Sequence, residues 1–511
     1  MRLYNTLTRR EEEFVPQEDK IIRMYACGPT VHDRFTIANA RAFLTFDVLR
    51  RYLEFKGYKV LYTQNITDIE DRIIEKAHEL GIPAEEVARR YTEAFFEDRA
   101  RLGIAPPTYQ PRATEVIPKI IEFIKALIAK GYAYVVDRDV YYRVRKFPGY
   151  GKLSGKDLEE LEAGARVEPD PRKEDPLDFA LWKAAKPGEP AWEAPWGRGR
   201  PGWHIECSVM AMTTLGETID IHGGGADLIF PHHENEIAQS EALTGKPFAR
   251  FWVHNGLVMV GEEEMHKSLG NFEYARDVIA RHGKEAVRLF FLSRHYRKPV
   301  NFSHEGIEEA RAAIERVYNL LEEIEAETES EQEPKPEPEL EGHPHREQGQ
   351  GRGERREPTE EFSAYLATVR EEFEREMDDD FNTPGGIGVI FELVRRTNIF
   401  KQTAPQGRPG LEHAMLLRRA AELIRELGRP LGLFQEEDRK AAIAGAAQTQ
   451  IGADFQEELI NLLVEVRGEL RARREFELAD KIRARLNELG IELRDKGEGT
   501  VWTIRSKRCT G

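Results

Sequence analysis

A strand–turn–helix–strand unit near the N-terminus constrains the fold of this chain more than any other feature. Residues 21–26 have the pattern of a short strand that ends at Cys27, in a turn signal rich in Gly and Pro. Apolar residues then recur at helical spacing as far as about Lys56, Gly57 ends that helix, and residues 58–62 have the pattern of the next strand. This order is typical of the parallel sheet of a nucleotide-binding α/β fold.

The sheet is expected to be interrupted and then resumed. Helical patterns cover residues 68–101 and 115–130, and a strand-rich stretch punctuated by Pro and Gly follows at 132–200. Strand patterns return at 218–222 and 252–254. The simplest account is a parallel sheet that carries an insertion between its two halves.

The C-terminal half has a mainly helical pattern with two interruptions. Residues 274–327 are predicted to be helical, and the Glu/Pro/Gly/Arg-rich residues 328–358 cannot bury enough apolar surface to offset their ordering entropy, which predicts a disordered linker. An Ala/Gly/Gln-rich stretch near 439–452 predicts a second linker. The remaining predicted elements are helices at about 360–378, 386–402 and 412–428, two charged helices in the last 60 residues, and strands at 491–493 and 501–504.

Composition excludes a membrane-spanning chain. No run of about 18 apolar residues exists, and the N-terminus has no export signal, so we expect a cytoplasmic protein. The net charge of −16 argues only weakly against nucleic acid, because a large enzyme can carry a local basic face. With three cysteines, a disulfide framework is improbable.

Four side chains are candidates for a metal site. His232 and Glu236 are four residues apart after Pro231, which favours a helix start, so both would lie on one helical face. Cys27 and Cys207 would complete a tetrahedral zinc set. Spacing alone does not show that residues 180 apart meet. Two buried thiols beside an unrelated His/Glu pair remain the alternative at this point.

Short motifs throughout the chain resemble those of cysteinyl-tRNA synthetases, in the same order, over nearly the whole chain except the 328–358 linker. The matching segments are Tyr25–Val31, Asn65–Asp68, Gly202–Ser208, Asp220–Gly225, Phe230–Gln239, Lys267–Phe272, Met377–Pro384, Ala479–Asp480 and Gly499–Trp502. The resemblance implies an α/β fold: a Rossmann-type class I synthetase catalytic domain with an inserted acceptor-binding domain, then a helical bundle and a small α+β C-terminal anticodon-binding domain.

The resemblance also implies domain boundaries. The expected segments are the first half of the catalytic domain at 1–115, the inserted acceptor-binding region at 116–200, the second half at 201–256, the signature loop and stem-contact helices at 257–327, the linker at 328–359, the helical bundle at 360–440 and the anticodon-binding domain at 452–511.

The activity implied by the resemblance is ATP-dependent activation of L-cysteine to cysteinyl-adenylate, followed by transfer to the 3′ end of tRNA(Cys). ATP would be used with Mg²⁺, each subunit would hold one Zn²⁺, and the protein would be a monomer. Family positions assign Cys27, Cys207, His232 and Glu236 as the zinc ligands. They assign Thr67, Trp203 and Asp227 to the amino-acid pocket.

The chemistry explains why such an enzyme would use zinc. Cysteine and serine differ by one atom, for which an apolar pocket discriminates by only about 1–3 kcal/mol. Zinc prefers a thiolate strongly and lowers the pKa of the thiol that it binds. We therefore interpret the ion as one that recognises the substrate.

ATP requires groups that receive phosphate and neutralise its charge. The turn Thr36–Asn39 precedes a helix whose N-terminal amides can receive phosphate, and Lys267 is the catalytic cation expected to meet pyrophosphate. Gly223, Gly224 and Gly225, after a strand, would let the adenosine approach the backbone closely.

Both ATP motifs depart from the family pattern. The family's His-x-Gly-His or His-x-Gly-Asn is Thr36-Ile37-Ala38-Asn39 here, so a hydroxyl replaces an imidazole and a methyl group is added. The family's Lys-Met-Ser-Lys-Ser is Glu264-Met265-His266-Lys267-Ser268, which puts a carboxylate where a cation would face phosphate. We expect activation that is weaker or differently organised.

The C-terminal segment from Arg467 to Lys507 is rich in Arg and Lys. In this family that favours anticodon contact, with phosphates bound by Arg and Lys and a base stacked on Trp502. Asp480 or Asp495 would read base edges, and Cys509 would be a free surface thiol. Two other functions stay open: a cysteine-activating ligase with a small amine acceptor, and a catalytically weakened relative that binds tRNA or zinc.

Overall fold

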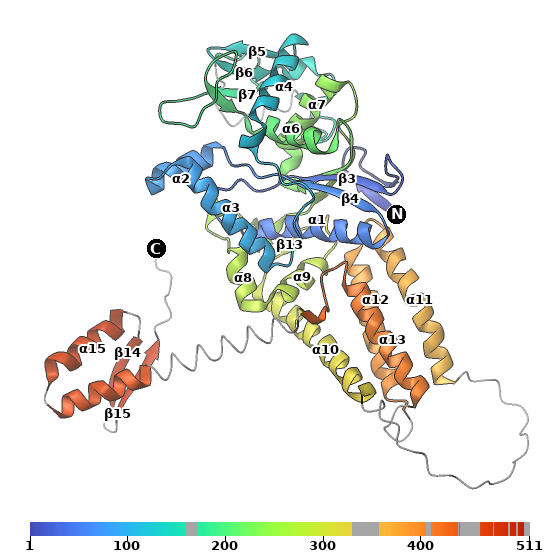
Figure 1. Cartoon of the computed structure of the whole chain (residues 1–511), viewed down its shortest axis with the longest axis vertical. Helices are drawn as coiled ribbons and strands as arrows, with labels where there is room; N and C mark the ends of the chain where they lie inside the picture. The colour runs from blue at the N-terminus through green and yellow to red at the C-terminus, as the bar shows by residue number, and fades with distance from the viewer. Residues whose placement is uncertain are drawn as a thin grey trace, which may run out of the picture. The chain divides into compact units, whose positions relative to one another are not determined.

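The computed structural model divides into two compact units, Met1–Gln435 and Glu436–Gly511 (Figure 1). The residues that the structure describes are 1–158, 171–329, 357–404, 410–437, 439, 460–473, 475–488, 491–496 and 499–504. The two predicted linkers, at 328–358 and 439–452, fall almost entirely outside these ranges.

A four-stranded parallel sheet forms the centre of the first unit. Its strand order is β10 (Ala249–Asn255), β9 (Ile219–Gly225), β3 (Ile21–Ala26) and β4 (Lys59–Gln64). Helix α1 (Ile37–Phe55) connects β3 to β4. The predicted strand–helix–strand unit and the resumed sheet are therefore confirmed.

Helix α1 lies within the core. Its buried face carries Phe43, Phe46, Leu49 and Leu53, and the chain leaves the helix at Gly57, whose φ of +87° suits glycine. The helical pattern predicted for 68–101 is two helices, α2 (Asp71–Leu80) and α3 (Ala84–Arg101). They are separated because Gly81 takes a left-handed conformation and Pro83 precedes α3.

The inserted region has its own antiparallel sheet and shares a hydrophobic core with one face of the parallel sheet. Tyr142, Leu181 and Trp182 are among its buried side chains, and Figure 1 shows the region on one side of the parallel sheet, with α1 on the other. Its elements are η1 (Ala113–Val116), α4 (Ile117–Ala129), β5 (Ala133–Val136), β6 (Asp139–Tyr142), η2 (Val144–Lys146), β7 (Phe179–Ala184) and β8 (Gly199–Pro201), with the sheet order β5-β6-β7-β8.

Two helices follow the inserted region, each of them directly before a strand of the parallel sheet. Helix α6 (Trp203–Leu215) precedes β9, and the short turns η3 (Ala226–Leu228) and η4 (Ile229–His233) lead into α7 (Glu234–Thr244), which precedes β10. The N-terminal hairpin, β1 (Arg2–Asn5) and β2 (Arg10–Glu13), precedes β3.

The segment predicted to be helical at 274–327 contains three helices and one short strand, and this strand pairs with one of the two short strands before the segment. The elements are β11 (Val258–Val260), β12 (Glu263–Glu264), η5 (Lys267–Leu269), α8 (Ala275–His282), α9 (Lys284–Leu292), β13 (Val300–Asn301) and α10 (His304–Glu329). Helix α10 therefore extends two residues past the predicted start of the linker.

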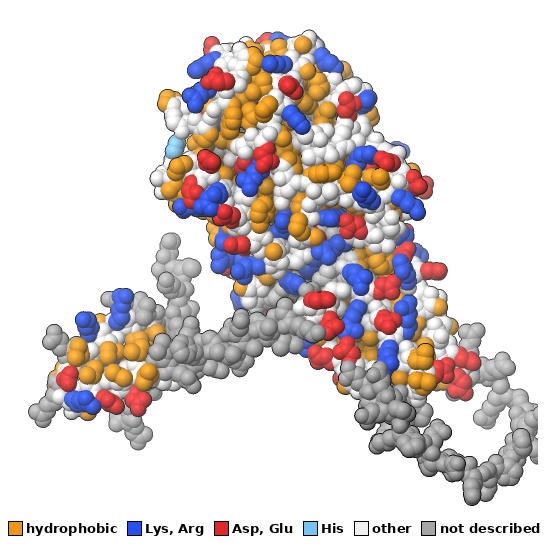
Figure 2. Space-filling view, in the orientation of Figure 1, with side chains coloured by type: hydrophobic (Ala, Val, Ile, Leu, Met, Phe, Trp, Pro, Cys, Tyr) orange, Lys and Arg blue, Asp and Glu red, His pale blue; other side chains and the backbone are white. Residues whose placement is uncertain are grey.

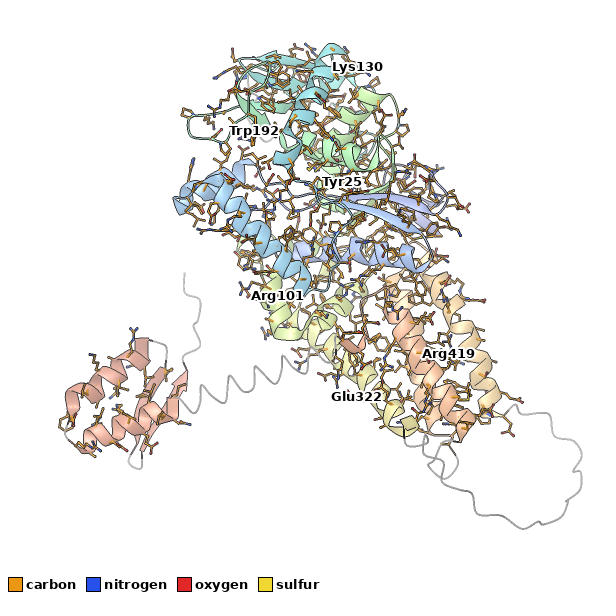
Figure 3. The ribbon with its side chains drawn as sticks, viewed as in Figure 1. Tyr25, Arg101, Lys130, Trp192, Glu322 and Arg419 are labelled. Carbon is orange, nitrogen blue, oxygen red and sulfur yellow. The ribbon has the colours of Figure 1, made fainter. Side chains whose placement is uncertain are left out.

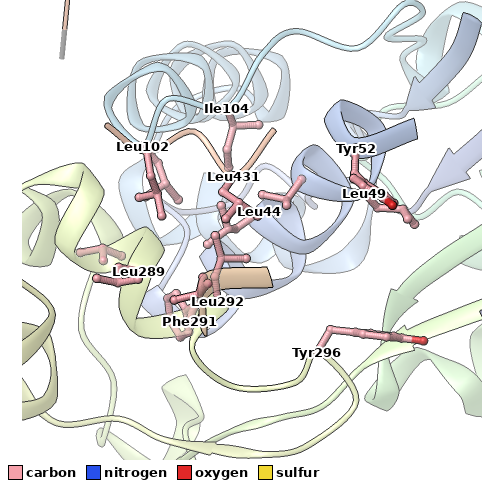
Figure 4. Packing of buried hydrophobic residues seen from close by; sticks show 14 of the residues in the cluster. Leu44, Leu49, Tyr52, Leu102, Ile104, Leu289, Phe291, Leu292, Tyr296 and Leu431 are labelled. Atoms are coloured by element: carbon pink, nitrogen blue, oxygen red, sulfur yellow. The ribbon is translucent and has the colours of Figure 1, made fainter. Parts of the chain in front are cut away.

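The helical bundle packs directly on the core beneath the parallel sheet. It contains α11 (Pro358–Asp378), α12 (Thr383–Lys401) and α13 (Leu411–Gly428). Leu431, just after α13, lies in one cluster with Leu44 of α1 and Leu292 of α9 (Figure 4). The buried guanidinium of Arg288 joins the same parts, because it donates to Asp47 Oδ2 at 3.0 Å and to the carbonyl oxygen of Leu431 at 2.9 Å.

The second unit combines helices with a two-stranded antiparallel sheet. Residues 460–472 are helical, α15 spans Phe476–Glu488, and β14 (Ile491–Lys496) pairs with β15 (Gly499–Ile504). Both predicted strands are confirmed. The side chains of Asp495 and Trp502, and Cys509 as a whole, lie outside what the structure describes.

The described surface of the first unit carries both signs of charge. On the face shown in Figure 2, Lys and Arg alternate with Asp and Glu below the parallel sheet, whereas apolar side chains gather over the inserted region. Among the described residues, the structure contains no helix that is long and apolar enough to cross a bilayer.

Candidate active site

A cavity of about 550 Å³ opens at the carboxyl ends of β3 and β9, where ligands bind in open α/β sheets. Cys27 follows β3 directly, and Gly225 ends β9. The predicted site residues that line the cavity are Cys27, Thr36, Asn39, Trp203, Gly225, Asp227 and Lys267.

The turn after β3 is held by a buried asparagine. Asn65 Oδ1 accepts hydrogen bonds from the Gly28 amide at 2.8 Å and from the hydroxyl of Tyr25 at 3.0 Å; Tyr25, labelled in Figure 3, belongs to β3 of the parallel sheet. A Cβ atom on Gly28 would lie 1.7 Å from the carbonyl oxygen of Asn65. This close approach requires glycine at position 28.

The four predicted metal ligands converge. One ligand atom from each of Cys27, Cys207, His232 and Glu236 lies within 4.8 Å of all the others. His232 Nε2 is 3.1 Å from Glu236 Oε1, and Cys27 Sγ is 3.6 Å from the same oxygen. The helix start predicted at Pro231 agrees with the structure, because Phe230 is extended and the helical turn that begins after it runs into α7.

A second donor set shares two of these residues. It consists of Cys27, His222, His233 and Glu236. His222 Nε2 lies 2.9 Å from Glu236 Oε2, and His233 Nε2 lies 3.2 Å from Cys27 Sγ. Sequence reasoning selected neither histidine, although both stand in the matched segments Asp220–Gly225 and Phe230–Gln239.

The electrostatics of the first set suit a divalent cation. The hydrogen bond from Cys27 lowers the pKa of Cys207 to about 6, with burial opposing and His232 assisting. Burial opposes the charged forms of Glu236 and His232, but the histidines beside Glu236 lower its pKa to about 2. The thiolate of Cys207 and the Glu236 carboxylate raise the pKa of His232 to about 10. Two sulfur donors with an imidazole and a carboxylate match the ligands that zinc prefers.

Of the three residues predicted for the amino-acid pocket, Trp203 and Asp227 line the cavity and Thr67 does not. The ring of Trp203 lies 4.3 Å from that of His232, and Asp227 lines the cavity beside it, where burial raises the pKa of its carboxyl group. Thr67 is buried and is not among the lining residues; its hydroxyl accepts from Asn65 Nδ2 at 3.1 Å. Thr30, which bridges to Thr67 through the backbone, lines the cavity in its place.

The predicted phosphate-binding turn caps α1. The Thr36 hydroxyl donates to Asn39 Oδ1 at 3.0 Å and accepts from the Asn39 amide at 3.3 Å. The Ile37 amide donates to the carbonyl oxygen of Glu273 at 2.9 Å. Two backbone amides at this helix terminus therefore already donate to acceptors within the protein. In this conformation these two amides are not available to bind phosphate, the role that the sequence predicted for the terminus.

The three glycines lie inside β9, whereas a position after the strand was predicted. Of the three, only Gly225 lines the cavity. A Cβ atom on Gly223 would lie 2.2 Å from the ring of Phe46, and one on Gly224 would lie 3.0 Å from the ring of His233. Packing within the protein therefore accounts for glycine at 223 and 224, and the predicted contact of these residues with adenosine stays a prediction.

Lys267 lies against the opposite wall. Its Nζ atom is 2.6 Å from Asp33 Oδ2, and the Tyr274 hydroxyl donates to the same oxygen at 3.0 Å. Burial lowers the pKa of Lys267. Burial opposes ionisation of Asp33, but the hydrogen bond from Lys267 outweighs it and lowers the pKa of Asp33. Glu264 of β12 lines the cavity and is exposed.

Comparisons with known proteins identify the family. Residues 13–312 match the model of the class I (C) tRNA synthetase catalytic domain, and residues 372–435 match the DALR domain. The chain is 46% identical over 511 residues to the cysteine–tRNA ligase of Thermodesulfovibrio yellowstonii, covering 99% of this chain and 100% of that protein. The chain belongs to the cysteine–tRNA ligase family. The family assignment makes it a class I aminoacyl-tRNA synthetase.

Further cysteine–tRNA ligases agree with this assignment. Those of Geobacillus thermodenitrificans and Thermococcus gammatolerans are 49% and 48% identical, each covering 98% of both chains. Among solved structures, a methionyl-tRNA synthetase from Mycobacterium tuberculosis in complex with methionyl-adenylate is similar, with a TM-score of 0.63 at 14% identity, covering 82% of this chain and 92% of that one. This likeness shows the class I fold. The full-length agreement does not favour a ligase with a small amine acceptor.

Proposed function

We propose that Cys27, Cys207, His232 and Glu236 hold one zinc ion, through which this cysteine–tRNA ligase selects its amino acid. The observation that carries this proposal is the convergence of these four ligand atoms from separate segments at the cavity. Two neutral thiols and an unrelated pair would not need to meet. When bound, zinc would offer the substrate sulfur a soft Lewis acid that serine oxygen cannot match.

The residues around this set would orient the rest of the amino acid. Trp203 covers His232 and limits the space beside it, while Asp227 offers a carboxylate to the α-ammonium group of the substrate. Thr67 would contribute indirectly, because its backbone pairs with that of Thr30 and holds Thr30 at the cavity wall.

ATP would lie between the N-terminus of α1 and the signature loop. Ala38 and Asn39 line one side and Lys267 the other. As the cysteine carboxylate attacks the α-phosphorus, negative charge grows on the pyrophosphate. The Lys267 ammonium group would leave Asp33 to neutralise that charge. The adenylate would then pass cysteine to the 3′ end of tRNA(Cys), whose anticodon the second unit would contact. We further expect a cytoplasmic monomer.

The test is ATP–pyrophosphate exchange with cysteine and with serine, together with metal content by plasma mass spectrometry. We expect one zinc ion per chain and exchange that depends on cysteine. Cys207→Ala should lose the metal and the preference for cysteine, whereas Cys509→Ser, outside the proposed set, should keep both. Full metal content in Cys207→Ala, or equal exchange with serine, would contradict the proposal.

A further inference from the structure

Two histidines that the proposed chemistry does not use form a hydrogen-bonded bridge between α8 and α10. His282 ends α8 and is buried, and His304 begins α10. His282 Nε2 lies 2.8 Å from His304 Nδ1. The outer nitrogens meet carboxylates, since His282 Nδ1 is 2.7 Å from Glu308 Oε1 and His304 Nε2 is 2.9 Å from Glu273 Oε1.

Proton counting makes this bridge unusual. Three contacts at hydrogen-bond distance join Glu308, His282, His304 and Glu273 in a row, and each contact requires one proton. Two neutral imidazoles bring only two protons. Wherever the third proton rests, the complete bridge contains one more proton than ionised carboxylates and neutral imidazoles supply. Without it, two lone pairs face each other across one of the contacts.

The charged groups around the pair are compatible with this extra proton. The two carboxylates contribute negative charge from α10 and from the segment before α8. Arg281 NH1 lies 3.4 Å from His304 Nε2, which is a weaker contact than that of Glu273 with the same atom. Arg311 pairs with the second oxygen of Glu308 at 3.0 Å. Among the described groups that contact the pair and its carboxylates, the two positive charges of the arginines therefore equal in number the two negative charges of the glutamates.

The bridge ends at the ATP motif. The backbone carbonyl of Glu273 accepts from the Ile37 amide, Tyr274 bridges to Thr36, and the Ala275 amide donates to the carbonyl oxygen of Phe35 at 3.1 Å. The segment 273–275 therefore ties the end of the signature loop to the first turn of α1. A displacement of Glu273 would shift both sides of the proposed ATP site.

We propose that His282 and His304 are positioning residues that share one additional proton and hold Glu273, and through it the N-terminus of α1, in place for ATP. The bridge is complete at lower pH and loses its third proton as pH rises. This proposal rests on the proposed ATP site at Thr36–Asn39 and Lys267.

The kinetic test uses zinc-loaded, full-length enzyme in ATP–pyrophosphate exchange from about pH 6 to about pH 9, a range that spans imidazole titration. We expect the KM for ATP to rise about threefold across this range while kcat changes less, as for the loss of one charge-assisted contact. His304→Gln keeps a donor for Glu273 but cannot take the extra proton, so its KM should be flat with pH. His78→Gln, on the exposed side of α2, is the matched control and should keep the wild-type profile.

A second readout does not depend on catalysis. Hydrogen exchange of the Ile37 amide, corrected for its intrinsic pH dependence, should be faster in His304→Gln than in wild type at low pH, and the two should converge at high pH. A wild-type pH profile in His304→Gln, or a uniform fall in kcat with an unchanged pH profile, overturns the proposal. If instead Lys267→Ala leaves ATP use unchanged, the proposed ATP site fails, while the Ile37 exchange still decides whether the bridge exists.

Discussion

The ammonium group of Lys267 is paired with the carboxylate of Asp33, with Nζ and Oδ2 2.6 Å apart, and it also donates to the carbonyl oxygen of Arg34 at 2.9 Å. ATP must therefore compete with Asp33 for this cation. Because the carboxylate and the phosphates bind the same group, the strength of the pair contributes directly to the apparent affinity for ATP.

Replacing Asp33 by Asn removes this competition. We expect the KM for ATP to fall about two- to fivefold in Asp33→Asn, as for a partly exposed ion pair worth up to about 1 kcal/mol. Initial-rate pyrophosphate exchange measures it. Tyr274→Phe, which removes one hydrogen bond to Asp33 but leaves its charge, should have a smaller effect. A higher KM in Asp33→Asn would mean that Asp33 aligns Lys267 for ATP.

Glu264 is expected to oppose ATP binding. Its carboxylate lines the cavity near the place proposed for phosphate, whereas Glu263, its exposed neighbour on β12, does not line it. Glu264→Lys should raise kcat/KM for ATP about three- to tenfold, since an unfavourable charge near phosphate is replaced by a favourable one. Glu263→Lys is the matched control for net charge. Equal gains in both variants would show that only the overall charge matters.

The two donor sets can be separated because they differ in two histidines. His232→Asn removes a ligand of the proposed set, and His222→Asn removes one of the alternative set. We expect His232→Asn to lose bound zinc. His222→Asn should retain zinc and bind it more weakly, about 10- to 100-fold, because His222 supports the Glu236 carboxylate. Zinc titration with a competing chelator measures both, and the reverse order would move the ion to the alternative set.

Contacts between α1 and α11 should make stability depend on pH. Burial opposes ionisation of Glu374, but hydrogen bonds from Lys56 and Arg370 outweigh it and lower the pKa of Glu374. Because its pKa is lowered in the folded protein, ionised Glu374 stabilises the fold at pH values above the ordinary glutamate pKa of about 4. This contribution is lost as pH falls through the lowered pKa. Glu374→Gln should therefore cost up to about 1 kcal/mol at neutral pH and almost nothing in acid. Thermal unfolding of wild type and Glu374→Gln at neutral and at acidic pH measures this change in stability, and the exposed Glu371→Gln is the control.

Much of the local structure was predictable from neighbouring residues. The first strand, α1 and its end at Gly57 follow from hydrophobic periodicity and from the backbone freedom of glycine. Local patterns failed where two signals compete. The break between α2 and α3 at Gly81 was missed because the helical periodicity continues across it.

The sequence by itself determined the family, the chemical types of the candidate ligands and the order of the elements, because motif identity and periodicity are properties of short segments. Only the tertiary structure decided which side chains meet. It brings Cys27 and Cys207 to Glu236, moves Thr67 behind the cavity wall, assigns Gly223 and Gly224 to internal packing and joins His282 to His304. These contacts depend on the packing of elements far apart in the chain, which no local pattern encodes.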